Sequence, residues 1–208
     1  MKYFYLILIT MAGLLYSSPS VSKTHAYQQN AAPLFGYERS LYLTQGVFRE
    51  YGDITRQGVE GTSDLENKWS GYGVKNSLGI ELLGFFQCGL SYEMLQSTIN
   101  AAEPETADGS RISLDTKLIF GSPLFNLETI AGGFMTFLNT RQNNQVTEFS
   151  GNGRYWGLGI NYGLSETLHI YGNYRNQEEE LRRQNGIGDF EGMKRDGAAI
   201  SMGLRVWL

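Results

Sequence analysis

The chain has 208 residues, of which 41% are hydrophobic and 18% charged, with a net charge of −4 and a mean hydropathy of −0.28. The acidic balance argues against a nucleic-acid partner, which would need a basic face, so no nucleic acid is expected. A content of 26 Gly, 13 Tyr and 11 Phe with only 4 Pro is not typical of a disordered chain. It favours closely packed strands.

The first 26 residues have the pattern of a secretory signal peptide. Lys2 gives a short positive region, residues 3–16 are apolar, and small residues lead to a cleavage site after Ala26. An apolar stretch of this length is short for a helical span, although an uncleaved membrane anchor is the alternative. We expect a signal peptide over residues 1–26, a periplasmic N-terminal segment over 27–37 and one barrel domain over 38–208.

From residue 38 onward, polar and apolar side chains alternate with a period of two, which indicates strands. In residues 110–120, aliphatic side chains such as Leu114 alternate with charged ones such as Asp115. The same pattern predicts further strands over residues 74–82, 86–94, 125–137, 156–162, 168–175 and 200–208.

The first strand, residues 41–51, is the least regular. Arg49 falls on its apolar face, and a bulge near Gly46 would shift the register and remove this conflict. With this strand the count is eight. Cys88 is the only cysteine, so no disulfide can form within the chain and stability must come from the sheet.

Short and long connections alternate along the chain. Tight turns are predicted at residues 83–85, 121–124 and 164–167, and long polar loops at 52–68, 97–109, 139–153 and 176–196. In transmembrane barrels short turns lie on the periplasmic side and long loops outside. The alternation therefore predicts an all-β, eight-stranded antiparallel up-and-down transmembrane β-barrel with four long extracellular loops.

Aromatic residues are sorted to the two strand ends, as expected where rings meet a lipid–water boundary. One group lies beside the short turns: Phe86, Phe120, Phe125 and Tyr162. The other lies toward the long loops: Tyr51, Tyr92, Phe137, Trp156 and Tyr174.

With these features, residues 38–208 resemble the eight-stranded outer-membrane β-barrel superfamily, of the OmpA-barrel and OmpX type. The resemblance rests on the strand and turn plan and on the C-terminal alternation from Ile200 to Leu208. It implies a monomer in the outer membrane of a Gram-negative cell, in contact with outer-membrane lipid and lipopolysaccharide. It also implies recognition of the last strand by the barrel-assembly machinery. That strand usually ends in an aromatic residue, whereas here Trp207 stands one place before the end.

The side chains opposite the apolar faces predict a polar lumen with four acids and five bases. They are Lys75, Glu81, Glu93, Arg111, Asp115, Lys117, Glu128, Arg175 and Arg205. Eight strands enclose a space that side chains just fill, so near-neutrality favours a lattice of ion pairs. A narrow path for ions or protons is the alternative interpretation.

His169 is the only histidine left after signal cleavage and the only candidate for acid–base catalysis. Some barrels of this size are lipid A deacylases or palmitoyltransferases that use a His with a Ser. The deacylase pattern has a Ser two residues after the His, where this chain has Tyr171. His169 also follows the short turn at 164–167, far from the outer leaflet where those enzymes act. We therefore expect a protein that is not an enzyme.

No spacing of His and Cys indicates a metal site, and no cofactor is expected. Acids in the predicted loops can gather divalent cations, and bases in the last loop can meet lipopolysaccharide phosphates. The acids are Asp53, Glu60, Asp64, Glu66, Glu103, Glu105 and Asp108, and the bases are Arg182, Arg183, Lys194 and Arg195. Solvated loop charge is the alternative for both groups.

Four functions are compatible with this pattern. The favoured one is a non-enzymatic outer-membrane barrel that acts in envelope integrity or in surface contact through its loops. The alternatives are a lipid A-modifying enzyme, a narrow channel, and a soluble eight-stranded carrier of the lipocalin type. The carrier would need an apolar interior and a polar exterior, the reverse of the assignment made above.

Overall fold

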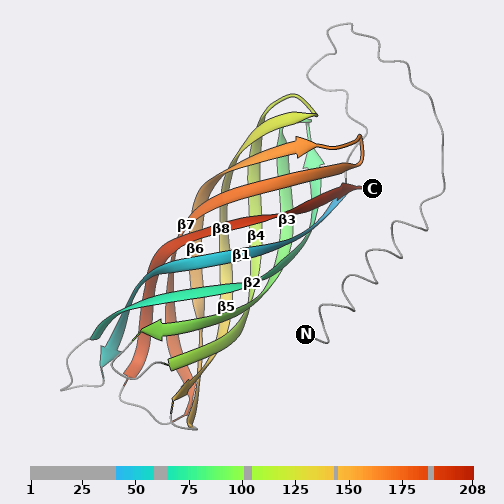
Figure 1. Ribbon diagram of the computed structural model, residues 1–208. Helices are drawn as coiled ribbons and strands as arrows, with labels where there is room; N and C mark the ends of the chain where they lie inside the picture. Colours follow the sequence, from blue (N-terminus) through green and yellow to red (C-terminus); the bar gives the residue numbers. More distant parts are fainter. Residues whose placement is uncertain (1–40, 59–64, 101–104, 143–144, 187–189) are drawn as a thin grey trace, which may run out of the picture. The chain divides into compact units, whose positions relative to one another are not determined.

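Eight antiparallel strands close into a barrel in the computed structural model, with each strand paired to the next and β8 paired to β1 (Figure 1). The structure describes residues 41–58, 65–100, 105–142, 145–186 and 190–208. The strands are β1 (Leu41–Gly58), β2 (Leu65–Leu82), β3 (Phe86–Asn100), β4 (Glu105–Gly121), β5 (Phe125–Gln142), β6 (Gln145–Gly163), β7 (Leu168–Asn185) and β8 (Phe190–Trp207). This confirms the predicted fold class. The predicted signal peptide and N-terminal segment lie outside the described residues.

The three predicted short turns are confirmed. They join β2 to β3, β4 to β5 and β6 to β7, and they define what we call the turn end of the barrel. The opposite end, where β1 leads to β2 and β7 leads to β8, is called the loop end.

The prediction of four long loops is wrong over most of their length, because the strands continue through them. Only residues 59–64, 101–104, 143–144 and 186–189 lie between strands at the loop end. The reason is that the apolar side chains change from the outer to the inner face of the strand partway along it. On β3, Leu90 and Met94 face outward nearer the turn end, whereas Leu95 and Ile99 face inward nearer the loop end. A pattern that assigns every apolar residue to one face therefore ends the strand too early.

The proposed bulge near Gly46 is also wrong. β1 pairs without interruption from Leu41 to Arg56 with β2, and its register against β8 shifts only after Gln57. Arg49 consequently points outward, beside Tyr72 of β2 and Ile200 of β8. The first strand is regular, with a cation on its outer face.

The strands are staggered around the barrel, which fixes their tilt. A line of paired residues that starts at Val47 and crosses each strand in turn meets β1 again at Gln57. The stagger around the barrel is therefore ten residues. Such a stagger tilts the strands by about 40° and leaves an interior that side chains fill.

Aromatic rings fill much of this interior by lying across glycines of the neighbouring strand. In four cases the ring and the glycine are direct cross-strand partners: Tyr42 with Gly79, Phe48 with Gly73, Tyr155 with Gly132, and Phe134 with Gly153. A Cβ atom at any of these glycines would overlap the ring opposite. These four glycines are thus a packing requirement of the narrow lumen.

We predict that Gly153→Val destabilises the barrel by about 1–3 kcal/mol, because the new side chain overlaps the Phe134 ring. Gly133→Val is the matched control. Gly133 faces outward across from Arg154, and a Cβ there would find its nearest neighbour at 3.7 Å. Urea unfolding of both variants in detergent micelles measures the difference. Equal stability of the two variants would contradict the packing argument.

Candidate functional site in the barrel lumen

The structure places all nine predicted lumen residues on the inner face of the barrel. Eight are buried and Glu81 is half-buried. Glu81 accepts a hydrogen bond from the side-chain amide of Gln87 at 2.9 Å. The alternation of neighbouring side chains across a strand is sufficient to fix this placement.

Five further charged residues face inward that the sequence did not assign to the lumen: Glu50, Arg56, Glu105, Glu179 and Arg195. Four of them fall in the segments predicted as long loops, and Glu50 lies in the irregular first strand. Continuing the period of two beyond Arg175 would have found Glu179. With these five, the fourteen charged lumen residues named here comprise seven acids and seven bases.

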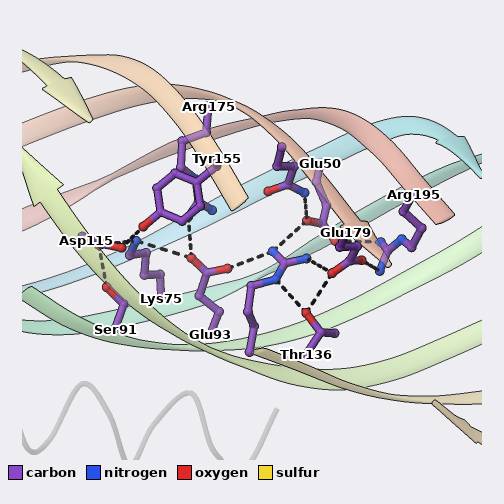
Figure 2. A network of polar contacts seen from close by, with 12 residues as sticks. Glu50, Lys75, Ser91, Glu93, Asp115, Thr136, Tyr155, Arg175, Glu179 and Arg195 are labelled. Carbon is purple, nitrogen blue, oxygen red and sulfur yellow. Dashed lines mark hydrogen bonds and ion pairs between the residues drawn. The ribbon is translucent and has the colours of Figure 1, made fainter. Parts of the chain in front are cut away.

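Arg111, on β4, is the centre of the network. Its Nη1 donates to Glu50 at 3.2 Å and to Glu93 at 3.1 Å, and its Nη2 lies 3.4 Å from Glu179. Thr136 accepts from Arg111 Nε at 3.2 Å and donates to Glu179 at 2.8 Å. Carboxylates from three different strands thus share one guanidinium (Figure 2).

Arg195 closes the loop-end side of this cluster. It lies 3.2 Å from Glu50 and 2.6 Å from Glu179. Its guanidinium carbon is 3.5 Å from the centre of the Trp69 ring, a distance typical of a cation–π contact. Two arginines and two glutamates are therefore held together directly beneath the apolar part of the lumen.

Toward the turn end, the network continues through Glu93 and Asp115. Arg175 donates to Glu93 at 2.8 Å, and the Lys75 ammonium lies 3.4 Å from Glu93 and 2.9 Å from Asp115. Ser91 donates to Asp115 at 2.7 Å, and the Tyr155 hydroxyl also donates to Asp115 (Figure 2). Each carboxylate thus has several charged or hydroxyl partners.

A second cluster lies nearer the turn end. Arg205 and Glu128 form a bidentate pair, with nitrogen–oxygen distances of 2.6 and 3.1 Å. Lys117 adds a third charge at 3.5 Å from Glu128. Bidentate pairs of this kind are among the strongest hydrogen-bonded contacts in proteins.

An apolar plug, defined by ten buried side chains, fills the lumen at the loop end. They are Phe48, Ile54, Trp69, Leu95, Ile99, Ala107, Leu138, Phe149, Leu181 and Met193. Arg56 and Glu105 form an ion pair on the loop-end side of this plug. Arg56 is the next inward residue of β1 after Ile54, and Glu105 is the inward residue of β4 just before Ala107. An ion crossing the barrel would have to break the network and then enter an apolar medium, both of which are costly.

The outer face has the opposite character, so the lipocalin-type alternative is wrong. Large apolar side chains are more than half exposed around the wall: Leu90, Leu114, Leu158 and Met202 are examples. The predicted aromatic groups also point outward, and all of them are exposed except Phe86, which is half-exposed. An apolar exterior around a charged interior is suited to lipid, not to water.

The edge of this apolar wall that lies nearest the loop end, called here its upper edge, is uneven. On β5 the outward positions stay free of charge and large polar groups from Phe125 to Phe137, but on β7 they do so only from Leu168 to Tyr174. Beyond Tyr174, the outward residues of β7 are polar or charged.

His169 lies inside the barrel at the turn end, 2% exposed. Its Nδ1 is 2.8 Å from the side-chain amide nitrogen of Asn161, and its ring meets Trp207 edge-on. Trp207 faces the lumen because it stands one residue before the end, and the terminal outward position is occupied by Leu208.

The charged residues predicted for cation or lipopolysaccharide binding do not all lie on the outer face. Arg195 and Glu105 face the lumen, which corrects both assignments. Asp53, Glu66, Asp108, Arg182 and Lys194 face outward, Arg183 is half-buried, and Glu60, Asp64 and Glu103 lie outside the described residues.

Within the described ranges, no three His, Cys, Asp or Glu side chains are grouped to hold a metal ion. None of the described residues forms a helix long and apolar enough to cross a membrane.

The sequence matches no protein-family model and no curated protein. The chain has the same fold as solved outer-membrane proteins, two of which are described next. Neisserial surface protein A has a TM-score of 0.52 and 10% identity, with coverage of 80% of this chain and 97% of that protein. OprG, an outer-membrane protein from Pseudomonas aeruginosa, has a TM-score of 0.53 and 12% identity, with coverage of 85% and 99%. The chain has the fold of the eight-stranded outer-membrane β-barrels. Its apolar exterior fits the outer-membrane location predicted from the sequence.

We predict that Arg111→Met lowers the free energy of unfolding of the barrel by about 3–5 kcal/mol, because three buried carboxylates lose a shared partner. Lys194→Met is the control, since Lys194 and its partner Asp196 are both about half exposed. Its effect should stay within about 1 kcal/mol. Urea unfolding in micelles gives both values, and a similar small loss for Arg111→Met would show that the network contributes little.

Proposed function

We propose that this chain is a non-enzymatic, non-conducting outer-membrane barrel that acts in envelope integrity or surface contact. The observation that carries the proposal is the filled lumen: a balanced ion-pair network lies beneath an apolar plug. Both features favour rigidity over transport. Surface contact would use the outer wall of the extended strands, since the connections at the loop end are short.

The same arrangement argues against the narrow-channel alternative. Arg111 and Arg195 are held by Glu50 and Glu179 on the axis-facing side of the wall. A permeating ion would need these pairs to separate and would then meet Leu138 and other plug side chains.

We predict that the purified protein shows no steady conductance in planar lipid bilayers. The variant Leu138→Ala with Leu181→Ala should also stay silent, because the ion-pair network beneath the plug still fills the lumen. Steady single-channel conductance of the unmodified chain would overturn the non-conducting part of the proposal.

The enzyme alternative would require His169 to act from the turn end. There it contacts Asn161 and Trp207 within the lumen, on the side away from the outer leaflet. The position two residues later is Tyr171, which also faces inward. This environment supports a structural role for the histidine.

We predict that expression of the protein leaves the mass spectrum of lipid A unchanged, and that His169→Ala gives the same spectrum. The comparison needs cells with matched amounts of folded barrel, checked by heat-dependent gel mobility. A lipid A mass change that disappears in His169→Ala would establish the enzyme alternative instead.

A further inference from the structure

The outer wall of β1 and β2 carries a pair of carboxamide side chains within its apolar part. Gln45 and Asn76 are direct cross-strand partners, and Gln45 Nε2 donates a hydrogen bond to Asn76 Oδ1 at 3.2 Å. Both side chains point outward, because the adjacent residues Thr44 and Lys75 are buried in the lumen. The two strands lie side by side in the wall (Figure 1).

This pair lies well inside the apolar wall. The outward rows on either side of it are apolar: Leu43 with Leu78 toward the turn end, and Val47 with Val74 toward the loop end. Tyr72, near the upper edge, lies four residues beyond Asn76, which is about 10 Å of height on a strand tilted by about 40°. Gln45 lies equally far from Leu41, the first residue of β1. The pair is therefore within the hydrocarbon layer, which offers no hydrogen bonds.

The hydrogen bond between the two side chains uses only part of their capacity. It leaves the Gln45 carbonyl oxygen and the Asn76 amide group without a partner among the described residues. Such groups are costly in an apolar medium. Other outward carboxamides of the described strands, such as Gln96 and Asn176, lie at or beyond the upper edge, where water can bind them. The pair on β1 and β2 thus requires a contact that supplies one donor and one acceptor at its own depth.

We propose that the outer wall of β1 and β2 is the contact face of a homodimer in the membrane, in which Gln45 and Asn76 of both copies join in a ring of four carboxamides. Around a two-fold axis along the membrane normal, each residue meets the partner copy at its own depth. Neighbouring strands are about 4.8 Å apart, so cross-strand partners on tilted strands differ in depth by about 3 Å. The Gln45 carbonyl of each copy can then accept from the Asn76 amide of the other.

The hydrogen-bonding complementarity favours a second copy over an unrelated partner. An unrelated protein would need its own donor and acceptor at this depth, whereas a second copy has both by symmetry. Arg49 does not oppose the contact at the axis, because it lies four residues beyond Gln45, at the level of Tyr72. A long side chain there extends its guanidinium to the headgroups. The inference rests on the outer-membrane placement of the barrel, and it replaces the monomer implied by the family resemblance.

The first test is sedimentation equilibrium of the purified full chain in density-matched detergent micelles. The unmodified chain should form a reversible dimer, and the double variant Gln45→Leu with Asn76→Leu should raise the dimer dissociation constant about tenfold or more. Asn152→Leu is the matched control, because it removes an outward carboxamide from β6, on the opposite side of the closed barrel. Its dissociation constant should equal that of the unmodified chain. Heat-dependent gel mobility verifies that each variant is folded.

The second test is cross-linking in vesicles of phosphatidylethanolamine and phosphatidylglycerol, with Cys88→Ser as the background. A short bismaleimide should give a covalent dimer from Val47→Cys, but not from Leu158→Cys, which is similarly exposed on β6. Adding Gln45→Leu and Asn76→Leu should abolish the Val47→Cys product.

The proposal is overturned if the unmodified chain is monomeric in both media, if the two cysteines cross-link equally, or if the leucine double variant dimerises as tightly as the unmodified chain. A monomer would leave the conductance and lipid A mass predictions unchanged, so failure here is separable from failure of the proposed function.

Discussion

The pairing of charge inside a narrow barrel is the constraint on which the rest of the structure depends. The fourteen charged side chains named above face the lumen, and they comprise seven acids and seven bases, almost all of them buried. Arg111 illustrates the requirement, since it forms ion pairs with carboxylates from β1, β3 and β7 at once. Some pairs join neighbouring strands, whereas others, such as Arg175 of β7 with Glu93 of β3, cross the lumen, so the network ties opposite walls together. Loss of one member leaves its partners buried without compensation.

Along each strand the apolar side chains change from the outer face to the inner face, so one continuous sheet is apolar outside near the turn end and apolar inside near the loop end. Near the turn end the wall is apolar outside and charged inside, as lipid requires. Near the loop end Ile54, Leu138 and Leu181 turn the interior apolar, while Glu178 and Lys194 point outward. The upper part is therefore built like a soluble barrel with an ordinary core. The plug and the ion-pair network meet at Trp69, whose ring carries the Arg195 guanidinium.

The sequence was sufficient to predict the strand number, the short turns and the inward placement of Asp115, Lys117 and Glu128, because strict alternation surrounds these residues. The prediction failed where the apolar side chains change faces. Glu179 and Arg195 lie on regular strands, but residues 176–196 have the composition of a polar loop. The pairing itself could not be predicted. Arg195 and Glu50 are 145 residues apart, and their contact depends on the stagger accumulated around the whole barrel.

The uneven upper edge of the apolar wall has a consequence for the membrane itself. The lipid-facing surface continues for three more outward positions on β5 than on β7, which is about 20 Å along a tilted strand. A flat bilayer cannot match both strands, so the mismatch would be relieved by tilting of the barrel axis or by local thinning of the leaflet next to β7. Thinning would lower the lipid headgroups next to β7 relative to those next to β5. In either case the direction of the response is fixed by the sequence, because the step in the apolar edge lies between β5 and β7.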